Sequence, residues 1–254
     1  MELQRHFVEK PWGRTNLPPA FAAPLGRRVG EVWYETPDAA PLPLLVKWLF
    51  TSEKLSIQVH PSDAEAQASG LPSGKEECWY IVDAEPGAVL GIGTVRPLDS
   101  EELRAASLSG EIEQLIDWKP VKAGDYFYIP AGTVHAIGAG VTLVEVQQYA
   151  DITYRLYDYG RPRALHLDDG VAVSKAVPYG DPRSGHVAGN VQLVEGPHFQ
   201  LWMVADAAGL AAVPDDAVRW VVPVAGVGVG SCRLVSAGEA VPFDGQMLVA
   251  STSF

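Results

Sequence analysis

Three short segments each carry two polar residues two positions apart in otherwise apolar text: Gln58 and His60, Lys75 and Glu77, and Glu145 and Gln147. In a β-strand, side chains two positions apart leave the same face. Polar pairs on one face of apolar strands predict a wet or metal-lined barrel interior. Cys78, one step from Glu77, is expected to point the other way and to pack as a small hydrophobic residue.

A fourth segment, GDYFYIPAGTVH, has the spacing G-x5-P-x-G-x2-H. Its Pro130 and Gly132 predict a tight turn between two strands, and His135 is expected to start the returning strand. This spacing is that of the second sequence motif of the cupins, without a departure. The segment therefore resembles the turn that carries a metal-binding histidine in that superfamily.

The first cupin motif normally reads His-x-His followed by a Glu, and here Gln58-x-His60 stands in its place with Glu77 after a longer insertion. A metal site needs donors that converge from different strands, and imidazole and carboxylate groups suit zinc and its neighbours. We expect one divalent metal, bound by two imidazoles, a carboxylate and an amide oxygen: Gln58, His60, Glu77 and His135. Such a donor set leaves the metal a net positive charge, so that it remains a Lewis acid.

With Gln58 in place of the first histidine, the sequence resembles the type I mannose-6-phosphate isomerases, in particular their shorter bacterial form. The resemblance covers about residues 8–170, through PWG, GEVWY, LPLLVKWLF, SIQVHP, GKEECWYI, GDYFYIPAGTVHAIGAG and EVQQYADITYRLYDYGR. It implies a zinc-dependent aldose–ketose isomerase that interconverts mannose 6-phosphate and fructose 6-phosphate, with zinc on the four ligands above. It also implies three pocket cations and one pocket carboxylate: Lys47, Lys75, Arg155 and Glu145.

The cations themselves fit such a substrate. Lys47, Lys75 and Arg155 lie in strand-like text beside apolar neighbours, where an unpaired cation is costly. Cations near a metal suit an anionic ligand, and the planar guanidinium suits phosphate. Isomerisation moves a proton between C2 and C1 through an enediolate, which a metal and an adjacent cation stabilise. The candidates for moving the proton are Glu145, Lys75 and a metal-bound water, and Arg155 is expected to assist.

Each of these residues also has a structural interpretation. Lys75 fits a solvated lysine at the rim, and Lys47 fits a strand residue that extends its amine to water. Arg155 has Asp151 and Asp158 nearby as ion-pair partners. Glu145 fits a group that only orients a ligand.

Two other functions compete with the isomerase. One is a non-catalytic cupin that binds a sugar phosphate. The other is a different metal-dependent cupin enzyme, such as an iron or manganese oxygenase, although Gln58 argues against it because oxygenases usually carry more histidine ligands.

The elements that must position these residues are predicted to be mainly β-strands. They are expected to form a cupin-type double-stranded β-barrel (jelly roll). Strand-like text runs over 31–59 and resumes at Val121, and a helical insertion is expected at about 98–118, capped by Asp99 or Ser100. Residues 1–160 are predicted to form the catalytic barrel with an irregular N-terminal lead-in, and 161–190 a connector. Residues 191–254 are predicted to form a smaller β module, a reduced second cupin without metal.

Composition limits the remaining possibilities. The net charge of −12 argues against nucleic acid or an anionic membrane as a partner. The partner that the resemblance implies is a small sugar phosphate. Two cysteines are too few for a disulfide framework, and reduced thiols are expected. We find no apolar run of the roughly 18 residues that a membrane helix needs, and no signal peptide, so cytoplasmic residence is the default expectation. Monomer and homodimer both remain open.

Overall fold

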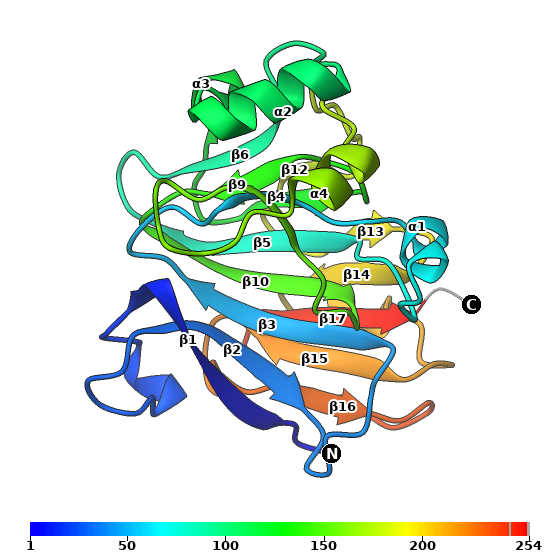
Figure 1. Cartoon of the computed structure of the whole chain (residues 1–254). Coiled ribbons are helices and arrows are strands. Elements are labelled where there is room, and N and C mark those ends of the chain that lie inside the picture. Colours follow the sequence, from blue (N-terminus) through cyan, green and yellow to red (C-terminus); the bar gives the residue numbers. More distant parts are fainter. Residues whose placement is uncertain (244, 253–254) are drawn as a thin grey trace.

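The computed structural model describes residues 1–243 and 245–252 and arranges them in three antiparallel sheets (Figure 1). The largest sheet has seven strands in the spatial order β1 (Gln4–Arg14), β2 (Val29–Glu35), β3 (Leu44–Phe50), β10 (Val141–Gln148), β5 (Glu77–Ala84), β8 (Asp125–Ile129) and β12 (Ser184–His186). A five-stranded sheet faces it, in the order β11 (Tyr154–Tyr157), β4 (Ile57–Val59), β9 (His135–Ile137), β6 (Val89–Thr94) and β7 (Ile116–Pro120). The C-terminal sheet also has five strands: β13 (Val191–Glu195), β14 (Phe199–Val204), β17 (Met247–Thr252), β15 (Arg219–Pro223) and β16 (Arg233–Val235).

The helices are short and connect or cover the strands. They are α1 (Asp63–Ala68), α2 (Ser100–Ser109), α3 (Ile112–Leu115), α4 (Leu167–Val173) and α5 (Ala207–Ala211), with a single 3₁₀ turn at Pro19–Phe21. In Figure 1, α2, α3 and α4 gather at one end of the molecule, beside the sheet that contains β6 and β9. Over the described ranges, no helix is long and apolar enough to cross a membrane.

The helical insertion begins where the sequence predicts it. The Asp99 carboxylate accepts a hydrogen bond from the Glu102 backbone N–H, and the Glu102 carboxylate accepts one from the Asp99 N–H, so α2 starts with a capping box. It ends at Gly110, whose φ of 84° only glycine adopts readily. The helical insertion ends sooner than predicted: α3 stops at Leu115, and residues 116–120 form β7, because Ile116 and Trp118 pair with β6.

Alternation along the strands divides the interior into two layers. On β10, Val144 and Val146 pack toward the C-terminal sheet, whereas Leu143 packs into the barrel formed by the first two sheets. Cys78 lies in the same cluster as Val144 and Val146, which confirms that it points away from the barrel interior. The prediction of a mainly β, barrel-like architecture with a helical insertion is therefore confirmed.

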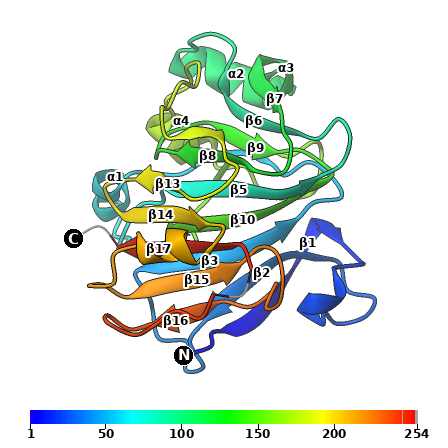
Figure 2. The same ribbon diagram turned by 180° about the vertical axis from the view of Figure 1, so that it is seen from behind.

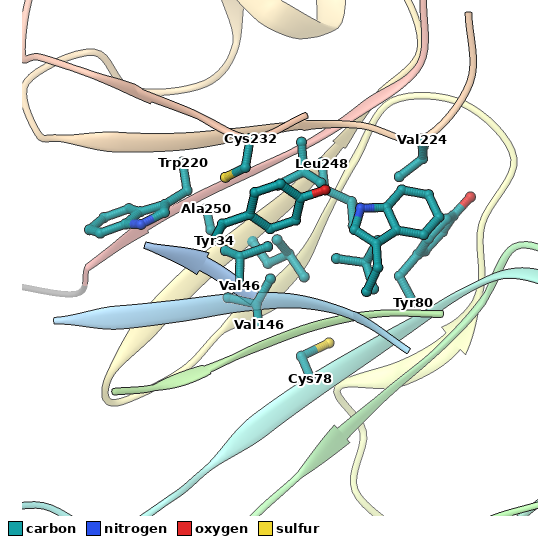
Figure 3. Packing of buried hydrophobic residues seen from close by; sticks show 14 of the residues in the cluster. Tyr34, Val46, Cys78, Tyr80, Val146, Trp220, Val224, Cys232, Leu248 and Ala250 are labelled. Carbon is teal, nitrogen blue, oxygen red and sulfur yellow. The ribbon is translucent and has the colours of Figure 1, made fainter. Parts of the chain in front are cut away.

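The C-terminal sheet covers the outer face of the seven-stranded sheet, and the two are seen from opposite sides in Figures 1 and 2. Figure 3 shows the layer between them, where Tyr34 and Val46 lie against Trp220 and Leu248. Tyr34 also donates its hydroxyl to the Gly230 carbonyl, 2.7 Å away. This layer is apolar and ties the last quarter of the chain to the barrel strands.

The prediction of an irregular backbone at the N-terminus is wrong over the eleven residues of β1. Residues 4–9 pair with β2, and the chain before them joins β16: Leu3 N–H donates to the Cys232 carbonyl at 2.9 Å, and Leu234 N–H to the Met1 carbonyl at 2.8 Å. One extended segment thus borders both the seven-stranded sheet and the C-terminal sheet. Local propensity could not reveal this, because the partners lie far away in the sequence.

Candidate metal centre

Three metal-ligating side chains meet inside the barrel. His60 directly follows β4, Glu77 begins β5 and His135 begins β9, and their ligand atoms all lie within 4.8 Å of one another. All three residues are at most 2% exposed. The turn at Pro130 and Gly132 places His135 directly opposite Gln58 of β4. The group is thus assembled from three strands, as the spacing of the motifs predicts.

The geometry of this group fits a metal ion. Glu77 Oε1 lies 3.5 Å from His135 Nε2, and Glu77 Oε2 lies 3.6 Å from His60 Nε2. These distances are too long for good hydrogen bonds, so the donor atoms surround a common point instead of pairing. His135 Nδ1 donates to the Thr133 carbonyl at 2.8 Å, which leaves the Nε2 lone pair directed at that point.

The electrostatics of the group also favour a cation. Burial lowers the pKa of His135 to about 4 and the pKa of His60 well below its usual value, so both rings are neutral and able to ligate at neutral pH. Burial and the neighbouring Glu145 raise the pKa of Glu77, although Lys75 opposes this shift. A buried carboxylate is costly without a cation, and a divalent ion among these donors would offset that cost.

Gln58, the fourth predicted ligand, lies beside the group with its amide Nε2 3.3 Å from His135 Nε2. Its Oε1 accepts from the Ser56 hydroxyl at 3.1 Å. A hydroxyl both donates and accepts, so Ser56 supports either orientation of the amide. A half-turn of the amide would present Oε1 to the site and keep the contact with Ser56.

Two buried lysines and a buried carboxylate adjoin the metal-type group. Lys75 Nζ lies 3.0 Å from Glu77 Oε2 and 3.3 Å from His60 Nε2. Lys47 Nζ lies 3.1 Å from Glu145 Oε1, and Lys75 Nζ lies 4.0 Å from the same oxygen. Lys47 is 3% and Lys75 5% exposed, so neither is a solvated surface lysine.

The charges of this network hold one another in the ionised form. Burial alone would raise the pKa of Glu145, but Lys75 and Lys47 outweigh it and lower that pKa. Burial alone would lower the pKa of Lys75, but Glu77 and Glu145 raise it. The Trp79 indole N–H donates to Glu145 Oε2 at 3.0 Å and fixes the carboxylate from the other side.

A cavity of about 280 Å³ adjoins this network. Gln58 and Lys75 line it and also contact the two histidines, so the cavity reaches the metal-type group through them. Its wall is strongly charged, with contributions from Lys10, Glu31, Lys47, Lys75, Glu145, Asp151, Arg155 and Arg163. The described residues around it thus form a polar pocket of the size of a small anionic metabolite.

Arg155 lies on β11 at the wall of the same cavity. Its Nη1 donates to the Ala164 carbonyl at 2.8 Å, and its buried Nε has no hydrogen-bond partner among the described residues. The alternative ion pairs of Arg155 with Asp151 or Asp158 are not formed within the described parts of the chain; Asp158 pairs with Arg161 and Arg163 instead.

The structure thus brings together all eight residues that the sequence singles out, and it adds others that sequence reasoning missed. Trp79, Lys10 and Arg163 also line the pocket. Strand alternation could have identified Trp79, because it stands two positions after Glu77 and its side chain therefore leaves the same face of β5. Arg163 fell in the segment predicted as a connector, where no strand pattern points to it.

Comparisons with known proteins relate the chain to one family of enzymes. No family model matches the chain. A mannose-6-phosphate isomerase of Streptococcus mutans is 44% identical over 137 residues, which are 52% of this chain and 43% of that protein. A Bacillus subtilis protein named as the probable mannose-6-phosphate isomerase GmuF is 34% identical over 212 residues, 67% of each chain. The matched region thus spans between about two fifths and two thirds of these curated relatives.

Solved structures extend the likeness over the whole fold. The crystal structure of mannose 6-phosphate isomerase from Bacillus subtilis superposes with a TM-score of 0.76 at 24% identity and covers 98% of both chains. A variant of phosphomannose isomerase from Salmonella typhimurium gives a TM-score of 0.70 at 15% identity over 100% of this chain and 99% of that one. At these identities the likeness concerns the fold, and it confirms the predicted fold class.

Proposed function

Because the chain belongs to the mannose-6-phosphate isomerase family, we propose that it is a metal-dependent isomerase that interconverts mannose 6-phosphate and fructose 6-phosphate. The observation that carries this proposal is the combination of a buried His–Glu–His group with a cavity whose wall holds lysines, a carboxylate and arginines. A neutral or apolar substrate would offer no negatively charged group to the cations of this wall. A sugar phosphate is also a metabolite of the cell interior, which makes the cytoplasm the expected compartment.

We assign the metal to His60, Glu77 and His135, with Gln58 as the fourth donor, and we propose zinc because two imidazoles, a carboxylate and a neutral oxygen suit it. Zinc would supply Lewis-acid polarisation of the oxygens on C1 and C2 of the open-chain sugar.

The protein's own groups complete the reaction. Glu145, fixed by Lys47 and Trp79, is an ionised acceptor at the cavity wall, and Lys75 is a protonated donor beside it. We propose that this pair moves the proton between C1 and C2. Arg155 offers free N–H groups to the developing negative charge or to the phosphate.

Among the described residues of the C-terminal region, no three metal-ligating side chains meet as they do in the barrel. Residues 191–254 contain one histidine, His198, whose Nδ1 lies 3.8 Å from Asp63 Oδ2 of α1. We propose that these residues form a metal-free module that supports the barrel.

A coupled assay of isomerisation, started with mannose 6-phosphate, tests the proposal. We expect turnover that disappears after treatment with a chelator and returns on addition of Zn²⁺, with Mn²⁺, Fe²⁺ and Co²⁺ as parallel additions. Chelator already saturated with metal is the matched control. A protein that retains one equivalent of metal and binds the sugar phosphate without converting it would support the non-catalytic alternative and exclude the isomerase.

A further inference from the structure

Two arginines, Arg161 and Arg163, share one buried carboxylate, Asp158, beside the cavity. Arg163 makes a bidentate pair with Asp158, with Nε to Oδ2 at 2.6 Å and Nη2 to Oδ1 at 2.7 Å. Arg161 Nη2 lies 2.9 Å from the same Asp158 Oδ1. Asp158 is 2% exposed, so its orientation is fixed by these pairs and by its burial.

The two arginines that share Asp158 point in different directions. Arg163 lines the cavity, whereas Arg161 does not; Arg161 Nη2 donates to the Lys54 carbonyl at 2.7 Å, and its Nη1 lies 4.0 Å from Glu53. A guanidinium carries five N–H donors. Asp158 accepts two of those of Arg163, so three remain for a ligand.

Positive charge exceeds negative charge in this cluster, where Arg155, Arg161 and Arg163 lie near the single carboxylate of Asp158. Burial and the charges on Arg163 and Arg161 lower the pKa of Arg155, although Asp158 opposes this shift, so the guanidinium groups repel one another. In the described structure no carboxylate forms an ion pair with Arg155. Such a cluster is unexpected in a chain with a net charge of −12, and an anion between Arg155 and Arg163 would relieve the repulsion.

The two buried lysines of the cavity wall are already neutralised. Lys47 pairs with Glu145, and Lys75 with Glu77. Their carboxylate partners make the surroundings of the lysines suitable for a metal and for sugar hydroxyls, and less suitable for a dianion. The cationic N–H donors that remain open are therefore those of Arg155 and Arg163.

We propose that Arg163, together with Arg155, forms the subsite that receives the phosphate of the substrate, and that Asp158 is the positioning residue for Arg163. The bidentate pair holds the Arg163 guanidinium in one plane and leaves its remaining N–H groups directed at the cavity. This inference rests on the proposed function, since it assigns one end of that substrate to one end of the pocket.

The test compares Arg163→Gln with Arg161→Gln, a matched control that removes an arginine from the same carboxylate but not from the cavity. The substrates are mannose 6-phosphate and unphosphorylated mannose at high concentration, and inorganic phosphate is the competing probe. We expect Arg163→Gln to raise KM for mannose 6-phosphate and the inhibition constant of phosphate by about 10-fold or more. Turnover of mannose and metal content should stay unchanged, and Arg161→Gln should alter all of these values less than 3-fold.

A variant of the positioning residue distinguishes a specific role from a loss of folding. Asp158→Asn keeps the shape of the side chain and weakens the hold on Arg163, so it should raise KM for mannose 6-phosphate while kcat changes less. Arg163→Lys should restore part of the affinity for phosphate. An Arg163→Gln protein that is folded and binds phosphate as the wild type does would overturn the subsite, and so would equal losses on both sugars.

Failure of the proposed function would look different. A wild-type protein without isomerase activity would contradict the isomerase, yet calorimetric titration with inorganic phosphate would still test the subsite. Binding by the wild type and by Arg161→Gln, together with its loss in Arg163→Gln, would support the subsite alone. Equal binding by all three proteins would exclude it.

Discussion

Along β10, Val144 and Val146 point to the C-terminal sheet, whereas Glu145 and Gln147 point into the barrel. The same division runs through β3 and β5. One face of the seven-stranded sheet is almost entirely apolar, and the other holds the charged network and the metal-type group. The two faces are built from alternate residues of the same strands.

The difference shows how the fold reconciles stability with chemistry. Buried charges such as Glu145 and Lys75 are costly unless each is paired, and even paired they contribute little net stability. Apolar burial stabilises by roughly 25 cal/mol per Å². The outer face therefore supplies the stability that lets the inner face hold buried charges in fixed positions.

The largest effect is expected from removal of the C-terminal sheet. A chain ending at residue 190 would expose the face formed by Val46, Trp48, Val144 and Val146, which are at most 1% exposed in the full chain. Apolar patches of this kind exceed what soluble monomers tolerate. We expect little soluble protein, measured by expression and size-exclusion chromatography beside the full-length chain. A soluble, fully active truncated protein would show that the outer face needs no cover.

The next effect concerns the inner face. His60→Ala combined with His135→Ala removes two of the three donors that meet inside the barrel. Lewis-acid assistance is worth several kcal/mol, so activity should fall by at least about 10³-fold. Metal analysis of the purified protein should give no bound ion, in place of about one equivalent.

A matched control removes two histidines that lie elsewhere. His6 pairs with Glu35 and His186 with Asp125, both at the surface. The variant His6→Ala with His186→Ala should keep its metal and its activity. Stoichiometric metal in the variant that lacks His60 and His135 would contradict the assignment of the centre.

Much of the inner face could be predicted from the sequence, because it depends on local rules. Period-2 alternation places Gln58 with His60 and Glu77 away from Cys78, and the turn residues Pro130 and Gly132 fix the start of β9. These rules act within a few residues, so they can be applied without knowing which strands pair with each other. The resemblance to a known family added the roles that alternation alone cannot supply.

The parts that the sequence did not reveal depend on contacts between distant segments. β1 looked irregular because its Pro11 and Gly13 suggest turns, yet it is held by pairing with β2. Arg163 lies in a loop without a periodic pattern. Only the path of the chain and the ion pair with Asp158 bring its side chain to the cavity. Tertiary position, not residue type, makes it a candidate.

The smallest effect concerns a single side chain of the outer face. Val146 is fully buried between the sheets, directly beside Glu145 in the chain. Val146→Ala removes two methyl groups and leaves a small cavity, which costs about 2 kcal/mol. For a chain of this size, that corresponds to a fall in Tm of roughly 4–8 °C, measured by calorimetry. The side chain points away from the pocket, so kcat/KM for mannose 6-phosphate should stay within about 2-fold of the wild type.

Val227→Ala removes the same atoms from a residue that is 71% exposed, and should leave Tm almost unchanged. A large loss of kcat/KM in folded Val146→Ala would mean that the two faces are coupled through the strand, and that the division of roles between them is wrong.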